Sequence, residues 1–187
     1  MSFPGIPSLD AAVMAFIQTH FHNTVTDTVF PIITSLGEAG IGWIVLSLVL
    51  LCFKKTRRTG GLVLIAMTVT LLFGELTLKN IICRLRPCNV FTDFPMLIAR
   101  PMSYSFPSGH TSSSFAAALI LTLRHKKVGW LAYIPAVLIA FSRIFLFVHY
   151  PTDVLAGILL GTLAALLTYF AAKAIQKRQA EKRTAQI

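Results

Sequence analysis

Charged residues are scarce in this chain, and acidic residues are the scarcest. Of 187 residues only 13% are charged, seven of them Asp or Glu, while 55% are hydrophobic. A water-soluble domain usually carries about 25% charged residues. Several apolar runs also approach the roughly 20 residues that a helix needs to cross a bilayer. The composition therefore argues against a water-soluble protein and predicts an integral membrane protein with one domain, residues 1–187.

Cysteine is also rare, with three residues in the chain. Cys52 lies in an apolar run, and we expect it to be a small core residue. Cys83 and Cys88 flank Arg86, and a disulfide would persist there on an oxidising outer face. Their spacing is not that of a common zinc site. Whether the two are bridged stays open. No cleavable signal peptide is expected, because residues 1–7 lack a basic segment.

The basic residues are arranged as topology signals. The net charge is +10, and twelve of the seventeen Lys and Arg residues fall within residues 54–58, 124–127 and 173–183. These clusters follow apolar segments, and such clusters face the cytoplasm in membrane proteins. We therefore expect the bilayer and no nucleic acid as their partner. The other five, on the opposite side, are Lys79, Arg84, Arg86, Arg100 and Arg143; of these, Arg84 and Arg100 are explained by side chains reaching toward lipid headgroups.

The apolar segments predict an all-α membrane bundle with five spans, residues 36–53, 61–82, 108–123, 128–148 and 152–172. Residues 9–21 are too short and polar to span, and they predict an amphipathic helix lying in the interface. Alternatively, residues 9–36 form a broken sixth span. We divide the chain into N-terminal helices (1–36), a catalytic bundle (37–176) and a basic cytoplasmic tail (177–187).

The first of three polar motifs is Lys79-x6-Arg86-Pro87, in which Pro87 is expected to stop the helix that carries Lys79. Ionisable side chains at the edge of apolar segments are costly in lipid and mark functional sites. Arginine offers a planar fork that matches phosphate oxygens, and lysine offers a point charge. Together with Arg143 from a later segment, Lys79 and Arg86 are expected to place three cations at one depth in the membrane. We also expect Glu75, one turn before Lys79, to pair with that lysine.

The second motif is Pro107-Ser108-Gly109-His110, at the start of an apolar segment. Ser108 is a good helix cap, and Gly109 allows a ligand to approach the backbone closely. Free N–H groups at a helix N-terminus bind anions. His110 is suited to donate a proton to a leaving oxygen. Taken alone, the motif fits an ordinary capped helix with an interfacial histidine equally well.

The third motif is Ser142-Arg143-x5-His149-x3-Asp153, with Pro151 between the last two residues. Proline favours the first turn of a helix, so a new helix is expected near Thr152. Asp153 in that turn can accept a hydrogen bond from one nitrogen of His149. The other nitrogen is then left as a nucleophile. A lone His–Asp pair is often structural, but its position beside Arg143 favours catalysis.

Together, the three motifs resemble the three-part signature of the type 2 phosphatidic acid phosphatase family, which is related in its active site to vanadium haloperoxidases. The resemblance covers Lys79 to Asp153, and the final helix is similar too. It implies a membrane lipid phosphate phosphatase that needs no metal ion or other cofactor, in agreement with the absence of a carboxylate cluster in the sequence.

The resemblance also implies roles for individual residues. His149 would be the nucleophile that forms a phosphohistidine, Asp153 would orient it, and His110 would protonate the leaving group. The phosphate would be bound by Lys79, Arg86, Ser108, Gly109 and Arg143. Small size and the lack of an inserted outer domain resemble compact bacterial members that act on undecaprenyl diphosphate, at the outer face of the cell membrane. The sequence does not indicate the oligomeric state.

Other substrates and functions stay open. Phosphatidylglycerol phosphate, phosphatidic acid and sphingoid phosphates are alternative substrates, because nothing in the sequence measures the pocket for the lipid tail. A vanadate-dependent peroxidase would use the same phosphate-binding residues to hold vanadate, but the peroxidase relatives are soluble proteins. A lipid or phosphate transporter would require internal repeats or broken helices at the midplane, and no convincing repeat is found.

Overall fold

The computed structural model describes residues 3–184, and every regular element in that range is helical, as predicted. The elements are α1 (Ser8–His20), α2 (Thr24–Leu36), η1 (Glu38–Gly40), α3 (Ile41–Cys52), α4 (Arg57–Thr70), η2 (Leu71–Leu78), α5 (Lys79–Ile82), α6 (Pro87–Val90), α7 (Gly109–Arg124), η3 (Gly129–Ala132), α8 (Tyr133–Phe145) and α9 (Pro151–Thr184).

Two helical segments of the described chain are long and apolar enough to cross a membrane alone, Arg57–Val90 and Pro151–Thr184. A third candidate is the pair α2 and η1–α3, bent by 45°. The bend follows from left-handed backbone at Ala39 (φ 47°) and Gly40 (φ 70°). The expected span 36–53 is thus interrupted, and α2 joins α3, whereas the six-span alternative joined it to α1. The number of spans stays a prediction.

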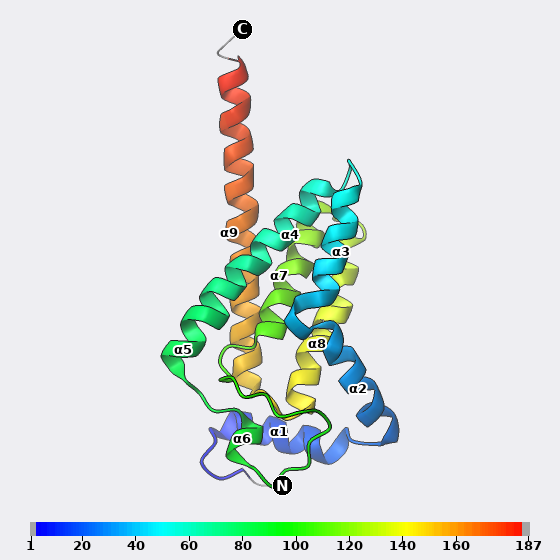
Figure 1. Cartoon of the computed structure of the whole chain (residues 1–187), viewed down its shortest axis with the longest axis vertical. Helices are drawn as coiled ribbons and strands as arrows, with labels where there is room; N and C mark the ends of the chain where they lie inside the picture. The colour runs from blue at the N-terminus through cyan, green and yellow to red at the C-terminus, as the bar shows by residue number, and fades with distance from the viewer. Residues whose placement is uncertain (1–2, 185–187) are drawn as a thin grey trace.

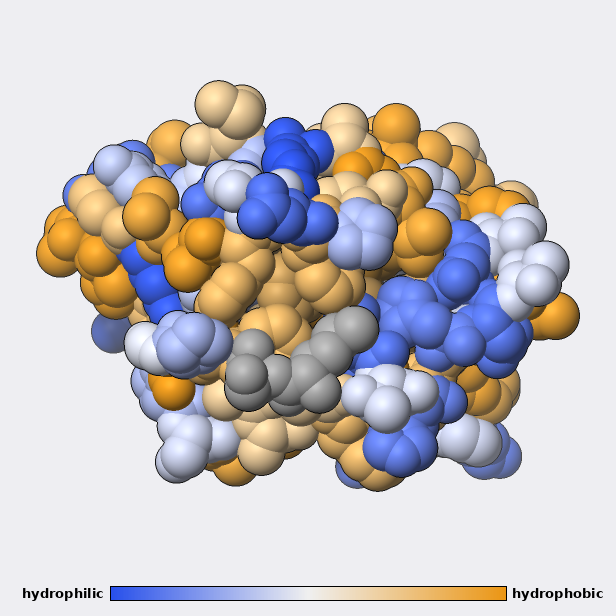
Figure 2. All heavy atoms as spheres, turned by 90° about the horizontal axis from the view of Figure 1, so that it is seen from below, coloured by the Kyte–Doolittle hydropathy of each residue, from blue (hydrophilic) through white to orange (hydrophobic). Residues whose placement is uncertain are grey.

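The basic clusters and the polar motifs lie at opposite ends of the bundle (Figure 1). The α3–α4 turn, the α7–α8 connection and the far end of α9 are at one end. Helices α1 and α6 lie across the other end, beside the long loop after α6. Polar and apolar side chains alternate on this second end face (Figure 2). A mixture of polar and apolar side chains is expected where a helix such as α1 lies in the membrane interface. The predicted tail, residues 177–187, continues α9, and its last three residues lie outside the described range.

Two glycines on α9 bring it close to α7. A Cβ atom at Gly157 would lie 2.7 Å from the carbonyl oxygen of Ser108, and one at Gly161 would lie 2.3 Å from that of Ser112. Small residues four apart let helix backbones approach in membrane proteins, where dispersion replaces the hydrophobic effect. Ser108 N also donates to the carbonyl oxygen of Asp153 (3.1 Å). The second and third motifs are therefore held together at the first turns of α7 and α9.

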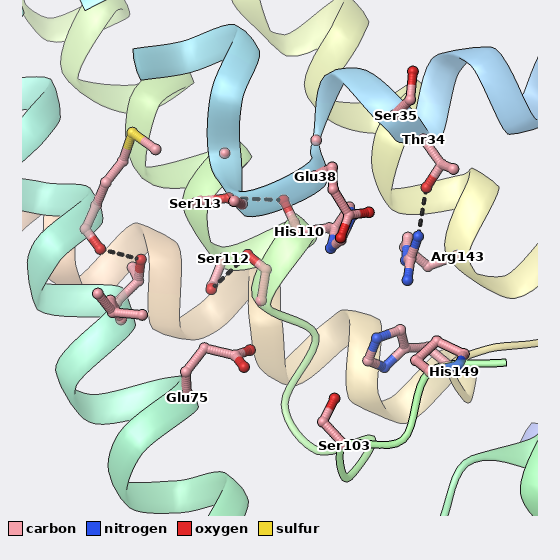
Figure 3. A pocket seen from close by; sticks show the side chains of 18 of the residues that line it. Thr34, Ser35, Glu38, Glu75, Ser103, His110, Ser112, Ser113, Arg143 and His149 are labelled. Carbon is pink, nitrogen blue, oxygen red and sulfur yellow. Dashed lines mark hydrogen bonds and ion pairs between the residues drawn. The ribbon is translucent and has the colours of Figure 1, made fainter. Parts of the chain in front are cut away.

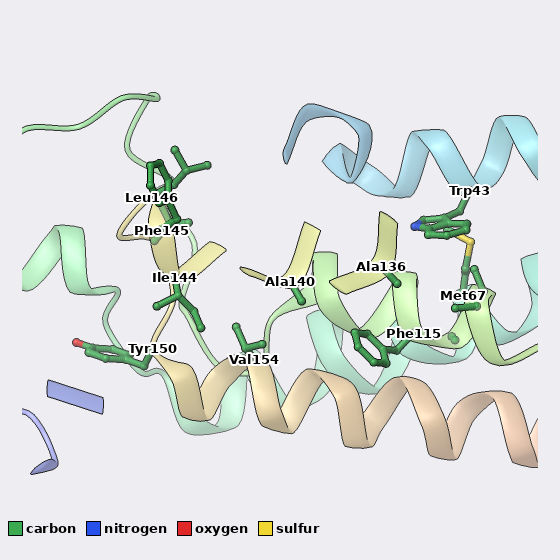
Figure 4. Close-up of a cluster of buried hydrophobic side chains, with 14 of the residues drawn as sticks. Trp43, Met67, Phe115, Ala136, Ala140, Ile144, Phe145, Leu146, Tyr150 and Val154 are labelled. Carbon is green, nitrogen blue, oxygen red and sulfur yellow. The ribbon is translucent and has the colours of Figure 1, made fainter. Parts of the chain in front are cut away.

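The buried apolar core runs along the bundle between these helices (Figure 4). Trp43 and Met67 meet at one end of it, and Phe115 lies near the middle. The Nε1 of Trp43 donates to Ser114 Oγ (2.9 Å), so its polar atom is satisfied inside the core. Small residues such as Ala136 and Ala140 on α8 complete the packing. This core gives α7 and α8 a fixed orientation beneath the motifs.

Several local expectations were wrong. Cys52 is exposed on the apolar surface and is not part of the core. Cys83 and Cys88, whose bridging the sequence left open, are both free thiols in the structure. Pro87 does not end the preceding helix. That helix already ends at Cys83, whose backbone is left-handed (φ 51°). Pro87 instead begins α6, where its missing N–H costs nothing.

Candidate active site

Most of the predicted site residues surround one cavity of about 860 Å³ (Figure 3). Residues from all three motifs line it, namely Lys79, Arg86, Gly109, His110, Arg143 and His149. Ser108 and Asp153 are fully buried behind this lining. Apolar side chains from α3, α4 and η2, including Ile44, Met67 and Leu71, line another part of the same cavity. The cavity thus combines a cationic region with an apolar one.

Arg86 directly contacts His149. Arg86 is held by the carbonyl oxygens of Ser103 (2.7 Å from Nε) and Val148 (2.9 Å from Nη1). Its Nη1 also lies 2.9 Å from His149 Nε2. Because a guanidinium can only donate, Nε2 accepts this bond and carries no proton. The proton of the neutral ring is therefore on Nδ1.

Asp153 lies on the other side of the same imidazole. Its Oδ2 is 3.5 Å from His149 Nδ1, an ion-pair distance that is longer than a good hydrogen bond. The same oxygen accepts a 2.9 Å hydrogen bond from Tyr150 N. As predicted, α9 starts at Pro151, and this places Asp153 in its first turn. The carboxylate faces the nitrogen that holds the proton.

His149 lies in the short connection between α8 and α9 and is 1% exposed. Burial lowers the pKa of His149 well below its ordinary value, and the positive charges of Arg86 and Arg143 lower it further. A buried imidazole is more stable without charge, since desolvation disfavours the protonated form. The ring is therefore neutral at neutral pH, and the lone pair on Nε2 accepts the hydrogen bond from Arg86.

Arg143 and His110 face the cavity from α8 and α7. Arg143 Nη1 donates to Thr34 Oγ1 (2.5 Å), a contact with α2 that the motif does not suggest. Within residues 3–184, Arg143 Nε is buried without a hydrogen-bond partner. His110 Nε2 lies 3.5 Å from Glu38 Oε2. Glu38 was not among the predicted site residues, and it is within reach only because the chain bends between α2 and α3.

The start of α7 is built as the motif predicts. Ser108 Oγ accepts hydrogen bonds from Thr111 N (3.4 Å) and Thr111 Oγ1 (2.9 Å). A Cβ at Gly109 would lie 2.2 Å from Glu75 Oε1, so a side chain there would displace the Glu75 carboxylate. The glycine therefore allows the close approach of a carboxylate from η2, in addition to any approach of a ligand.

Lys79 follows a π-helical segment, Leu71–Leu78, which turns Glu75 toward the cavity. Such segments occur often at functional sites. Lys79 Nζ contacts both Glu75 oxygens, at 2.8 and 2.6 Å, and this confirms the expected pairing. Lys79 is 5% exposed. With Glu38, the cavity lining thus contains two carboxylates that the phosphate would have to tolerate.

Neither Arg84 nor Arg100 reaches toward lipid headgroups, contrary to our expectation. Arg100 donates to the carbonyl oxygens of Cys88, Thr92 (2.6 Å) and Phe94 (2.9 Å) and so closes the loop after α6 on itself. Arg84 bridges two buried carboxylates, Asp10 and Asp153. The sequence did not distinguish a buried Arg84 from a lipid-facing one, because its carboxylate partners lie more than sixty residues away in the chain.

Comparison with known proteins identifies similar sequences and folds. Residues 59–177 match the model of the PAP2 superfamily. The undecaprenyl-diphosphatase of Sulfolobus acidocaldarius is 38% identical over 127 residues, 67% of this chain and 61% of that protein. Undecaprenyl-diphosphatase BcrC of Bacillus subtilis is 31% identical over 157 residues, 79% of this chain and 76% of that protein.

A solved structure shares the fold. It is the crystal structure of a transmembrane PAP2-type phosphatidylglycerolphosphate phosphatase from Bacillus subtilis. Its TM-score is 0.73 at 29% sequence identity, over 92% of this chain and 89% of that chain. The match includes residues well outside the three motifs, so the likeness extends to the whole helical arrangement.

Proposed function

Because the chain belongs to the PAP2 superfamily of membrane phosphatases, we propose that it hydrolyses a phosphomonoester or diphosphate of a membrane lipid. One observation carries the proposal. The imidazole of His149 and the cations Lys79, Arg86 and Arg143, from distant parts of the chain, line one cavity that continues into an apolar region. That arrangement suits a phosphorylated headgroup attached to a hydrocarbon tail.

The proposed reaction has two steps. His149 Nε2 attacks the terminal phosphorus, the bond to the leaving oxygen breaks, and His110 gives that oxygen a proton. The products are a phosphohistidine and the dephosphorylated lipid, or the lipid monophosphate if a diphosphate reacts. Water then attacks the phosphohistidine, passes a proton to His110 and releases inorganic phosphate. The cations stabilise the added negative charge in both transition states.

For the substrate we favour undecaprenyl diphosphate. Two relatives with this activity in their names are 38% and 31% identical to the chain. The apolar lining from α3, α4 and η2 would hold the first part of a polyprenyl tail. Phosphatidylglycerol phosphate is the main alternative, because the phosphatase with the matching fold is named for it. Phosphatidic acid is a further alternative.

We place the reaction at the outer face of the cell membrane. Twelve basic residues follow the ends of apolar segments away from the motifs, and basic clusters of this kind stay in the cytoplasm. The site would then receive a headgroup from the outer leaflet. No metal ion or other cofactor is proposed, and EDTA provides the test described in the Discussion.

The test is phosphate release by the purified protein. It would be offered undecaprenyl diphosphate, phosphatidylglycerol phosphate and phosphatidic acid separately in mixed micelles, and kcat/KM would be compared. We expect the protein to release inorganic phosphate, with the highest kcat/KM for undecaprenyl diphosphate. A higher value for another lipid would correct the substrate. No phosphate from any of the three would overturn the phosphatase proposal.

A further inference from the structure

Two residues that the proposed reaction does not use are connected to its nucleophile. Arg84 Nη1 donates to Asp153 Oδ1 (2.7 Å), and Arg84 Nη2 donates to Asp10 Oδ2 (2.7 Å). Both carboxylates are fully buried. A single guanidinium therefore joins the first helix, the segment after α5 and the start of α9, immediately behind His149.

This bridge is fixed at both ends. Asp10 Oδ1 accepts from Thr152 N (2.9 Å), and Asp10 Oδ2 accepts from Thr152 Oγ1 (2.7 Å). The guanidinium of Arg84 lies 3.7 Å from the centre of the Tyr150 ring. Planar guanidinium groups both stack on aromatic rings and form paired hydrogen bonds with carboxylates. A point charge such as lysine could not make all of these contacts.

The bridge also fixes the direction of the Asp153 carboxylate. Its Oδ1 is held by Arg84, and its Oδ2 accepts from Tyr150 N (2.9 Å). With both oxygens occupied, the group cannot rotate away from His149 Nδ1, 3.5 Å distant. The side chain is therefore prepared for the closer contact that a positive imidazole would favour.

The charges explain why two carboxylates are present. Arg84 contributes one positive charge, and Asp10 and Asp153 contribute two negative charges, so the group has one net negative charge. With Arg84 and Asp153 alone the group would be neutral, and Asp153 alone would be a buried carboxylate without compensation, which is costly. Asp10 thus leaves a net negative charge beside His149, where positive charge develops when the ring attacks phosphorus.

We propose that Asp10 and Arg84 are positioning residues that hold Asp153 in place and preserve its negative charge during phosphohistidine formation. The inference rests on the proposed function. Neither residue touches the cavity lining, so both would act through Asp153. Loss of either should lower kcat and leave KM nearly unchanged, because the phosphate-binding side chains remain.

The first experiment compares Asp10→Asn with Gln18→Leu in the full-length protein. Gln18 is the matched control, since it is also buried on α1 and donates to the carbonyl oxygens of Ile144 (3.4 Å) and Phe145 (3.1 Å), away from Arg84. We expect Asp10→Asn to lower kcat about 10- to 100-fold, as for residues that hydrogen-bond to metal-binding histidines in other proteins. Gln18→Leu should lower thermal stability but preserve kcat. Equal kcat losses in the two variants, or none in Asp10→Asn, would overturn the inference.

The second experiment separates positioning from folding. In an Asp153→Asn background, Asp10→Asn should cause no further loss of kcat, because residues that act through one another are not additive. A further loss of kcat as large as that in the single Asp10→Asn variant would show that Asp10 does not act through Asp153, and would overturn the inference. If Asp10→Asn does not fold, Arg84→Lys replaces it, with the same expected loss. Failure of the proposed function would differ, since wild type would then release no phosphate, or His149→Ala would release it equally well.

Discussion

Arg86 and His149 share a hydrogen bond through the nitrogen that the proposed reaction uses, with Nη1 and Nε2 2.9 Å apart. The contact keeps Nε2 free of a proton and aims it into the cavity. In the proposed reaction, the phosphate would therefore have to bind Arg86 before His149 could attack. Binding of the substrate and release of the nucleophile are therefore coupled through one guanidinium group.

His149→Ala is expected to abolish phosphate release while the protein stays folded, because no other imidazole lies at the attacking position. His20→Ala is a suitable control, since His20 is exposed at the end of α1. Acid quenching of wild type with radiolabelled substrate should trap an acid-labile phosphoprotein that is absent from His149→Ala. Near-normal rates in His149→Ala would show that another residue is the nucleophile.

Asp153→Asn should lower kcat by about 100-fold or more, as for carboxylates that orient a catalytic histidine in other enzymes. The amide lacks the negative charge that stabilises a positive imidazole. KM should change little, because Asp153 does not line the cavity. Steady-state kinetics provide the measurement, and a raised KM with unchanged kcat would indicate a binding role instead.

Gly157→Ala should destabilise the protein, since the new Cβ would lie 2.7 Å from the backbone oxygen of Ser108 and 2.9 Å from Thr111 Cβ. Overpacking of this kind costs about 1–3 kcal/mol. Gly61→Ala on α4 is the matched control, because its Cβ would meet nothing within 4 Å. The melting temperature and kcat should both fall in Gly157→Ala and stay unchanged in Gly61→Ala. Equal stability of the two variants would contradict the close α7–α9 contact.

Activity is expected to persist in EDTA and to be inhibited by vanadate. The reason is that fixed cations and N–H donors, in place of metal ions, would stabilise the five-coordinate transition state that vanadate imitates. Phosphate release would be measured after dialysis against EDTA and then across a vanadate series. A strict requirement for added magnesium would contradict this mechanism.

Labelling of single cysteines tests the orientation of the bundle. Cys52, Cys83 and Cys88 would first be replaced, and Met102→Cys or Gln179→Cys would then be added. Met102 is 94% exposed in the loop after α6, and Gln179 is exposed near the end of α9. An impermeant maleimide applied to intact cells should label the first and not the second. The reverse pattern would place the site in the cytoplasm.

The polar motifs could be found in the sequence because ionisable residues stand out in apolar segments. Pro151 predicted the start of α9, and Ser108 predicted the cap of α7; the structure has both. The pairing of Glu75 with Lys79 also followed from helical spacing alone. In each of these cases the interacting groups are near neighbours in the chain, so local geometry was sufficient.

The missed features depend on contacts between distant segments. Asp10 and Arg84 are 74 residues apart, and Arg143 and Thr34 are 109 apart. The short α1 resembled an ordinary amphipathic helix because its buried polar residues, Asp10 and Gln18, look like a solvated face. The π-helical segment before Lys79 was not expected from the sequence. The break between α2 and α3 depends on left-handed backbone at Ala39, a residue type that rarely adopts it.

The contact between Asp10 and Thr152 also has a consequence for biosynthesis. The two residues are separated by 142 positions, so α1 leaves the ribosome long before its partner has been translated. Arg84 is translated earlier and can already pair with Asp10, but the first turn of α9 is not yet available to either residue. The proposed nucleophile, His149, and its carboxylate, Asp153, also follow most of the bundle in the chain. If His149 and Asp153 act as proposed, a nascent chain can acquire catalytic competence only after the start of α9 has been translated, and termination before α9 would leave an inactive fragment.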